Sequence, residues 1–313
     1  MPARSKKQSP EFTPPCTRRD CSSLGFVNLF KPPGPSSTRF GARLRWIYGT
    51  RGEPKLAVGH VGTLDPLACG VLPIALGRAT RLIPLIADKR KSYAFTLVLG
   101  RATSSGDAGG EPTATAPVPA DSVARLERAI PEFIGRVEQV PPMVSALKID
   151  GRRLYRLARE GKTVERKSRA ITIYALAIVG EERDPPAIRL RVACSEGTYV
   201  RTLAEDLARA IGTVGHVGAL LREGSGPFII GESVTLDEIA ADPARALIPP
   251  ERVIAIPTIV LDGRGSADFR AGRIVAIPEP VGETHVFVRD VTRTLVGVGE
   301  MRGTMLAPRK VFV

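Results

Sequence analysis

The sequence predicts an α+β fold, followed by a smaller β-rich module at the carboxyl end. Segments with helical spacing and segments with strand composition are mixed up to about residue 250, without the regular alternation that a doubly wound parallel sheet requires. After about residue 254 the chain changes to short apolar runs separated by turn residues, which favours a small all-β module. We therefore expect a mobile, basic tail over residues 1–22, a main domain over 23–254 and a second domain over 255–313.

The composition is that of an ordinary globular protein. The chain has 313 residues, of which 43% are hydrophobic, so it can bury a sizeable core. No run of about 18 apolar residues occurs, so we expect no membrane span. Residues 1–22 lack the apolar stretch of a secretory signal, and we expect a cytoplasmic protein.

The first predicted elements are a strand and a helix, separated by a rigid turn. Residues 24–30 (LGFVNLF) have the composition of a short strand. The KPPGPSS that follows forces a turn, because proline fixes φ and Gly34 tolerates unusual backbone angles. Apolar side chains then recur at helical spacing over residues 37–48, which predicts a helix with Ser37 or Thr38 as its N-cap.

The middle of the chain alternates between strands and helices. Residues 92–99 and 170–179 have β-type composition, and apolar and polar residues alternate over 187–194, as in a strand with one buried face. Residues 121–134 return to helical spacing. The segment 102–119 is rich in Ala, Thr, Gly and Pro, and we expect a flexible loop there. A further helix is predicted over residues 201–211, directly after the last of these strands and its turn.

The charge is strongly and unevenly positive. The net charge is +13; residues 23–110 carry 12 Lys and Arg against 4 Asp and Glu, and residues 148–169 carry nine basic residues against three acids. Two local basic zones indicate a polyanionic partner, either nucleic acid or phospholipid headgroups, and we favour nucleic acid. A merely basic, solvated surface is the alternative.

Metal ligands are too scattered to indicate a metal site. The cysteines and histidines are Cys16, Cys21, Cys69, Cys194, His60, His216 and His285. No Cys-x-x-Cys pair occurs and the histidines are far apart in sequence, whereas zinc sites use clustered ligands. We expect no metal, a structural role for His216 and a surface position for His285.

One stretch carries the strongest chemical signal. Residues 59–82, GHVGTLDPLACGVLPIALGRATRL, place a single carboxylate, Asp65, among glycines, prolines and apolar residues. No Ser–His pair is adjacent to it, no Cys and His stand side by side in this stretch, no second carboxylate is close, and the chain has no phosphate-binding loop or dinucleotide fingerprint. A lone carboxylate can act as a nucleophile or as a base at a carbon that gains positive charge, with an arginine from elsewhere opposing its charge.

This stretch resembles the signature of the bacterial tRNA pseudouridine-55 synthases of the TruB type, in which the Asp of G-T-L-D-P is catalytic. Further segments resemble that family in the same order: KPPG (31–34), KSY (91–93), PPMVSALKIDGRRLYRLAREG (141–161), CSEGTYVRTLAEDL (194–207) and GHVGALLREGSGPF (215–228). The β-rich carboxyl end resembles a PUA domain, an RNA-binding module. The resemblance covers about residues 23–313, and several motifs in one order are far more specific than any one of them.

The resemblance implies a fold and a set of site residues. The fold would be a catalytic domain with a mixed, mainly antiparallel sheet flanked by helices, plus a PUA-like pseudo-barrel. Asp65 would be the catalytic carboxylate, Tyr93 would stack on the target base and assist proton movement at C5, and Arg201 would oppose the charge of Asp65. The residues implied in substrate binding are His60, Lys31, Tyr199, Leu220 and Lys91.

Two of these positions have an ordinary alternative. Tyr199 is as compatible with the core as with the site, and Lys31 with merely flanking a turn. The sequence also departs from the family pattern, since Val61 replaces a common Thr, and Leu221 and Gly224 stand where Arg is frequent. By comparison with that pattern, we expect weaker phosphate contact at these two positions.

The activity implied is the isomerisation of uridine 55 in the T-loop of tRNA to pseudouridine, without a cofactor. The uridine must be flipped out of the folded loop to be reached, and the resemblance suggests that His60 helps to displace the loop. We expect a monomer that binds the T-stem-loop, with no obligate protein partner and no membrane. Three other functions stay open: an RNA-guided synthase, an RNA-binding or tRNA-folding protein without required chemistry, and, remotely, a membrane-surface protein.

Overall fold

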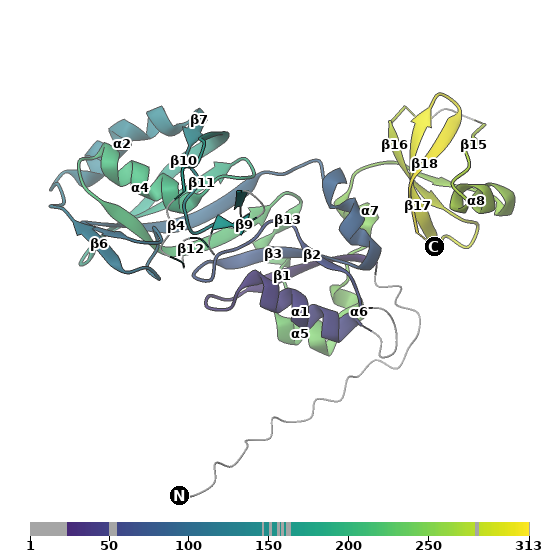
Figure 1. Ribbon diagram of the computed structural model, residues 1–313, viewed down its shortest axis with the longest axis horizontal. Helices are drawn as coiled ribbons and strands as arrows, with labels where there is room; N and C mark the ends of the chain where they lie inside the picture. The colour runs from purple at the N-terminus through teal and green to yellow at the C-terminus, as the bar shows by residue number, and fades with distance from the viewer. Residues whose placement is uncertain are drawn as a thin grey trace, which may run out of the picture.

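A computed structural model describes residues 24–49, 55–145, 147–149, 152–154, 157, 160, 164–278 and 282–312. The predicted tail and much of the basic segment 148–169 lie outside the described residues. The described chain forms a nine-stranded sheet, a separate five-stranded sheet and two small two-stranded sheets, with helices against them (Figure 1). The predicted α+β class is confirmed.

The large sheet is mixed and mainly antiparallel, as expected. Its strands run in the order β1 (Gly25–Lys31), β3 (Cys69–Leu76), β12 (Gly215–Ser225), β4 (Lys91–Leu99), β11 (Pro186–Cys194), β10 (Arg169–Arg183) and β7 (Gly135–Gln139), with β2 (Val58–His60) on β3 and β13 (Phe228–Ile229) on β12. All of these pairs are antiparallel except β3 with β12. The parallel pair places the strand that follows the Asp65 loop next to β12, near the middle of the sheet.

Helices pack against the large sheet through their apolar faces. They are α1 (Ser37–Tyr48), the 3-10 helix η1 (Gly77–Leu85), α2 (Ser122–Phe133) and α4 (Val200–Ala210). In Figure 1, α1 lies beside β1 and β3, whereas α2 and α4 lie at the other end of the sheet. The bounds of α1 agree with the prediction, but its N-cap is Ser36, and no side chain caps the helix. Ser37 does not act as the cap because its hydroxyl binds Leu64.

The segment 102–119 is not the unstructured loop that its composition predicts. It contains a hairpin of β5 (Arg101–Thr103) and β6 (Pro112–Thr115). Side chains hold its turn, since Thr103 Oγ1 donates to the Asp107 carbonyl at 2.7 Å and Asp107 Oδ1 accepts from Gly109 N at 3.0 Å. The hairpin therefore depends on local side-chain hydrogen bonds, which leave no hydrophobic periodicity in the sequence from which it could be predicted.

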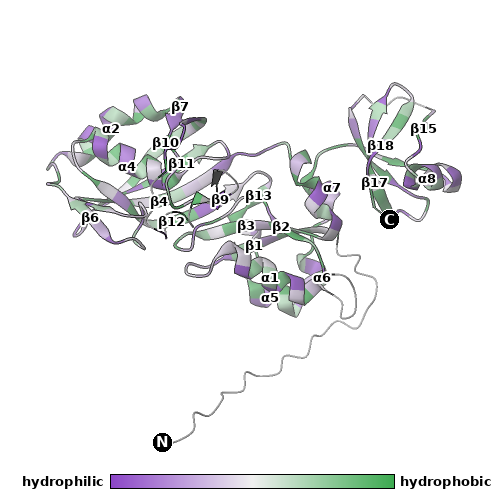
Figure 2. Cartoon of the chain, viewed as in Figure 1, coloured by the Kyte–Doolittle hydropathy of each residue, from purple (hydrophilic) through white to green (hydrophobic). Residues whose placement is uncertain are grey.

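The second sheet is built from the end of the chain. Its strands run in the order β14 (Thr258–Val260), β16 (His285–Arg289), β17 (Leu295–Arg302), β18 (Met305–Val311) and β15 (Val275–Ala276). The prediction of an all-β module is wrong in one element, the helix α8 (Gly263–Arg270). Asp262 caps it by accepting from Gly265 N at 2.6 Å, and Phe269 is fully buried against the sheet. In Figure 2, hydrophobic colour follows β17, whereas α8 is largely hydrophilic.

Short elements fill the remaining connections. They are β8 (Lys148–Ile149), β9 (Arg152–Arg153), the 3-10 helix η2 (Ile230–Glu232), α5 (Leu236–Ala241), α6 (Pro243–Ala246) and α7 (Pro250–Val253). One buried cluster joins the two large sheets, since Phe287 and Val298 of the second sheet share it with Phe26 and Phe228 of the first. Among the described residues, no helix combines the length and the hydropathy that a membrane crossing needs.

Candidate active site

The loop that carries Asp65 lies between β2 and β3 and is clamped to the start of α1. The Ser37 hydroxyl donates to the Leu64 carbonyl at 2.8 Å and accepts from the Leu64 amide at 3.0 Å. Gly34 N donates to the Pro66 carbonyl at 2.7 Å, which ties the loop to the KPPG turn. The backbone on both sides of Asp65 is therefore fixed by residues from a distant part of the sequence.

Lys31 supports this loop and is not accessible to a ligand. Its side chain is fully buried, and Nζ donates to the carbonyls of Pro32, Pro66 and Ala68 at 3.0, 3.1 and 2.6 Å. The prediction that Lys31 binds substrate is thereby corrected, because all three ammonium donors are engaged and none is accessible. The sequence left two roles open for Lys31, RNA contact and a place beside a turn, and the structure supports the second.

A second buried cation, Arg222, holds the start of the loop. It lies on β12, is fully buried, and donates through Nε to Val71 O at 2.7 Å, through Nη2 to Gly62 O at 3.1 Å and through Nη1 to Thr63 O at 3.3 Å. The sequence analysis missed this residue. The available signal was a charged residue directly after the apolar run ALL of the GHVGALLREGSGPF motif.

The centre of the site is an ion pair between Asp65 and Arg201. Arg201 Nε donates to Asp65 Oδ2 at 2.8 Å. The Arg201 side chain is 3% exposed, whereas that of Asp65 is 36% exposed. The guanidinium is fixed from behind by the carbonyls of Ser105 and Val144, at 2.7 and 2.8 Å. A rigid, buried cation therefore orients an accessible carboxylate.

A second carboxylate also reaches this centre. Asp107 Oδ2 lies 3.9 Å from Arg201 Nε, and its side chain is 12% exposed. Sequence proximity gave no carboxylate near Asp65, and the fold supplies one from the turn between β5 and β6. Asp107 is bound within that turn by Ser105 Oγ at 2.6 Å. Asp107 is more buried than Asp65, so its position fits a role in orienting Arg201 better than a role in contacting a ligand.

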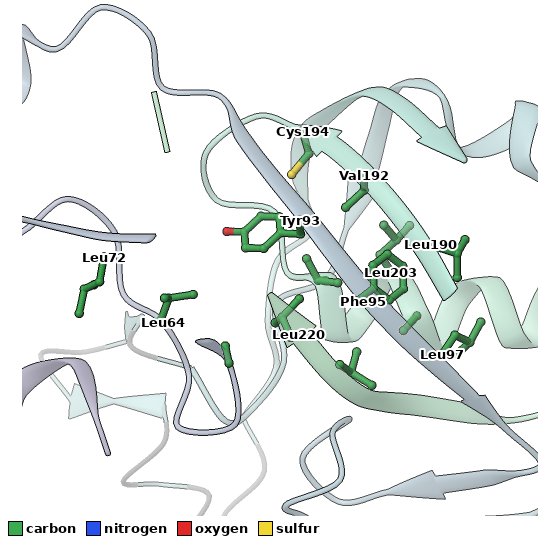
Figure 3. Close-up of a cluster of buried hydrophobic side chains, with 14 of the residues drawn as sticks. Leu64, Leu72, Tyr93, Phe95, Leu97, Leu190, Val192, Cys194, Leu203 and Leu220 are labelled. Carbon is green, nitrogen blue, oxygen red and sulfur yellow. The ribbon is translucent and has the colours of Figure 1, made fainter. Parts of the chain in front are cut away.

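Apolar side chains and one phenol line the neighbouring space. Tyr93 projects from β4 toward the side where Leu64 and Leu72 lie, with Cys194 and Leu220 close to its ring (Figure 3). Burial raises the pKa of Tyr93, and the nearby Arg222 guanidinium opposes that rise only in part. The phenol therefore stays protonated at neutral pH and presents a flat face beside Leu220.

The other predicted residues surround this centre at different depths. Lys91 begins β4 and donates to Ser225 Oγ at 2.5 Å; burial, followed by the nearby Arg222 charge, lowers the pKa of Lys91 to about 8. Tyr199 precedes α4, its backbone is held by the Gln139 side chain at 2.8 and 3.1 Å, and burial raises the pKa of its hydroxyl. His60 is exposed at the end of β2, where the Asp65 loop begins.

Neither of the other two described histidines lies in this site. His216 is buried, with Nδ1 2.8 Å from the Arg101 carbonyl, which is the predicted structural role. His285 is partly buried at the start of β16. The described residues contain no group of three or more His, Cys, Asp or Glu side chains placed to hold a metal ion.

The chain matches known families and structures over most of its length. Residues 45–200 match the TruB family pseudouridylate synthase N-terminal domain, and residues 201–249 match the tRNA pseudouridylate synthase B C-terminal domain. The tRNA pseudouridine synthase B of Pseudomonas paraeruginosa is 38% identical over 303 residues, covering 93% of this chain and 96% of that protein. That of Hydrogenovibrio crunogenus is 41% identical over 293 residues, covering 92% and 93%.

Solved structures agree in fold. The crystal structure of a Cbf5-Nop10-Gar1 complex aligns with a TM-score of 0.63 at 25% identity and covers 93% of this chain and 85% of that chain. An H/ACA RNP bound to a substrate RNA containing 2'-deoxyuridine aligns with the same score at 23% identity. From these matches, the chain belongs to the TruB family of pseudouridylate synthases and is an isomerase.

Proposed function

We propose that this protein converts uridine 55 in the T-loop of tRNA to pseudouridine, with Asp65 as the catalytic carboxylate. The observation that carries the proposal is the pair of an accessible Asp65 and a buried Arg201, 2.8 Å apart, in a loop clamped on both sides. The substrate follows from the relatives named tRNA pseudouridine synthase B and from the motif order in the sequence.

The reaction makes a specific demand on this carboxylate. The C1′–N1 glycosidic bond breaks, the uracil turns, and C1′ joins C5, whose hydrogen leaves as a proton. Asp65 either attacks C1′ or removes a proton from the sugar, and both routes need an ionised oxygen that faces the ligand. Arg201 holds one oxygen, Oδ2, and the partial exposure of the side chain leaves the carboxylate open to the ribose.

Tyr93 and Leu220 provide the surface for the base. Both are largely buried and adjacent, so a uracil that leaves the T-loop can replace its stacking in the RNA with contact on an aromatic ring. Because burial raises the pKa of Tyr93, its phenol is neutral and can donate a hydrogen bond or relay a proton near C5.

Other residues would bind the RNA around Asp65 and Tyr93. We propose His60 at the mouth of the site, where its exposed ring can occupy the space that the flipped nucleotide leaves, together with Lys91 and Tyr199. Lys31 acts only through the loop. Residues 23–254 would form the catalytic domain, and 255–313 a PUA-like RNA-binding domain.

We propose a stand-alone enzyme that needs no guide RNA, protein partner or cofactor and works as a monomer in the cytoplasm. The similarity to the synthase B relatives supports this, because it extends over nine-tenths of the chain at about 40% identity. The likeness to the Cbf5 and H/ACA structures concerns the fold.

Mapping the product tests two claims together: that position 55 is modified, and that the protein needs no guide RNA or protein partner. Unmodified tRNA is incubated with the purified protein alone, pseudouridine is derivatised with a carbodiimide, and reverse transcription locates the adduct. The proposal predicts one new stop, next to position 55, and none when that uridine is replaced by cytidine. A stop elsewhere would overturn the specificity, and a stop that requires added guide RNA would favour the RNA-guided alternative.

A further inference from the structure

We infer that Lys91, with Arg222 behind it, forms a binding site for an RNA backbone phosphate next to the target uridine. This inference rests on the proposed function, since it assumes an RNA whose uridine lies between Tyr93 and Asp65. The proposed function names Lys91 only as an RNA-binding residue, whereas this inference gives it one defined ligand, a phosphodiester oxygen.

The geometry centres on Gly62, at the start of the Asp65 loop. A Cβ at this position would lie 3.6 Å from both Lys91 Nζ and Arg222 Nη1, and the backbone has a φ of +87°. Glycine is favoured there because of that angle, and it leaves the space between the two cations free of a side chain. A phosphate can therefore approach the backbone closely at a point that two positive charges flank.

The carboxylates that act on Lys91, Glu196 and Asp88, are each paired with a different cation, Lys89 and Arg90. Within the described residues, neither Lys91, Arg222 nor Lys31 lies within ion-pair distance of a carboxylate. Lys31 and Arg222 each donate to three carbonyls. The ammonium of Lys91 donates to Ser225 Oγ and, within the described part of the chain, to no other acceptor. A partly buried cation with unused donors can gain both a hydrogen bond and an opposing charge from an anionic ligand.

The position of Lys91 favours contact with a phosphate of the RNA over contact with the target base. Lys91 and Tyr93 are two residues apart on β4 and so share one face of the strand, while Gly62 precedes Asp65 by three residues in the loop. A uracil on Tyr93 with its ribose at Asp65 therefore has a flanking phosphate beside Lys91. On β12, Leu221 and Gly224 bring no positive charge, and Lys91 supplies a partly exposed cation from the neighbouring strand.

A thermodynamic cycle tests the contact. Short T-stem-loop RNAs carry a neutral methylphosphonate at the linkage 5′ of the target uridine, at the linkage 3′ of it, or at a remote stem linkage. Affinity for each RNA is measured with the wild type, with Lys91→Met and with Lys91→Arg. Lys89→Met is the matched control, because Lys89 is exposed and pairs with Glu196 at 3.3 Å.

We expect Lys91→Met to bind the all-phosphate RNA about tenfold more weakly than the wild type, as for the loss of one charge-assisted hydrogen bond. One flanking methylphosphonate should weaken the wild type to the same extent and should weaken Lys91→Met no further. Lys91→Arg should keep most of the affinity, and Lys89→Met should match the wild type with every RNA.

Two results would overturn the inference. One is a loss in Lys91→Met that simply adds to the loss from each methylphosphonate, since Lys91 would then not touch either phosphate. The other is a lowered melting temperature of Lys91→Met with an equal loss for every RNA, which would indicate a structural role. Tritium release from the all-phosphate RNA by the wild type is measured in parallel, so a failure of the proposed function is seen separately.

Discussion

At the residue scale, the site depends on buried cations whose donors are used by backbone carbonyls. Among the residues that the structure describes, no carboxylate pairs with Lys31 or Arg222; each of the two donates to three carbonyl groups around the Asp65 loop. Arg201 combines both tasks, since two of its nitrogens bind carbonyls and the third binds Asp65. The shape of the loop thus depends on side chains that come from other parts of the sequence.

Replacing Lys31 should therefore cost stability as well as activity. Lys31→Met keeps the aliphatic stem but leaves the carbonyls of Pro66 and Ala68 unpaired in a buried region. We expect the free energy of unfolding to fall by about 2–4 kcal/mol, measured by urea denaturation. The exposed Lys89→Met should change it by less than about 0.5 kcal/mol. Equal stability of the two variants would show that the buried bonds do not matter.

Lys91 should give the protein a distinct dependence of stability on pH. Its pKa is lowered from the ordinary 10.5 to about 8, chiefly by burial. Between these values the unfolded chain holds a proton that the folded chain lacks, so the stability of the wild type should rise with pH relative to Lys91→Met. Below about pH 8 the difference should be constant, because both states are protonated.

The expected rise is roughly 1–3 kcal/mol over that window. It is measured as the difference in the free energy of unfolding between the wild type and Lys91→Met, with urea, at several pH values. Other titrating groups, Lys31 among them, are common to both proteins; Cys194 is coupled to the change, because burial raises its pKa and the charge of Lys91 opposes that rise. A difference that stays flat or falls with pH would mean that Lys91 is not desolvated in the folded state.

At the element scale, the contact between α1 and the Asp65 loop can be tested by comparing substitutions of two adjacent serines, Ser36 and Ser37. Ser37→Ala removes both hydrogen bonds to Leu64, whereas Ser36, the N-cap, makes no side-chain capping bond. We expect Ser37→Ala to lose about 1–2 kcal/mol of stability and to turn over more slowly at saturating tRNA, since the loop is less well placed. Ser36→Ala should behave as the wild type in both assays; equal effects would contradict the clamp.

The elements that periodicity specifies were predictable, and those that long-range contacts specify were not. Apolar residues at helical spacing predicted α1 and α4, and the alternation of side chains predicted β11. The α8 sequence GRGSADFR has two glycines and little apolar content, so its formation depends on the Asp262 cap and on Phe269 packing into the sheet. In the site, motif order identified Asp65 and Arg201, but Arg222 and Asp107 become visible only when distant segments meet in space.

At the scale of the whole molecule, the net charge of +13 should dominate the affinity for tRNA. Phosphate neutralisation releases counterions, so the dissociation constant should rise roughly a hundredfold or more when salt increases about fourfold around physiological strength. Filter binding at several salt concentrations gives the slope. A flat response would count against the two basic zones as the docking surface.

The central claim is that Asp65, held by Arg201, performs the chemistry. Its most direct test is tritium release from unmodified tRNA that carries 5-³H-uridine, because joining C1′ to C5 must expel the hydrogen at C5. We predict release by the wild type and none by Asp65→Asn, which keeps the shape of the side chain without its charge and should still bind tRNA. Release by Asp65→Asn at the wild-type rate, or none by a folded wild type that binds tRNA, would contradict the account.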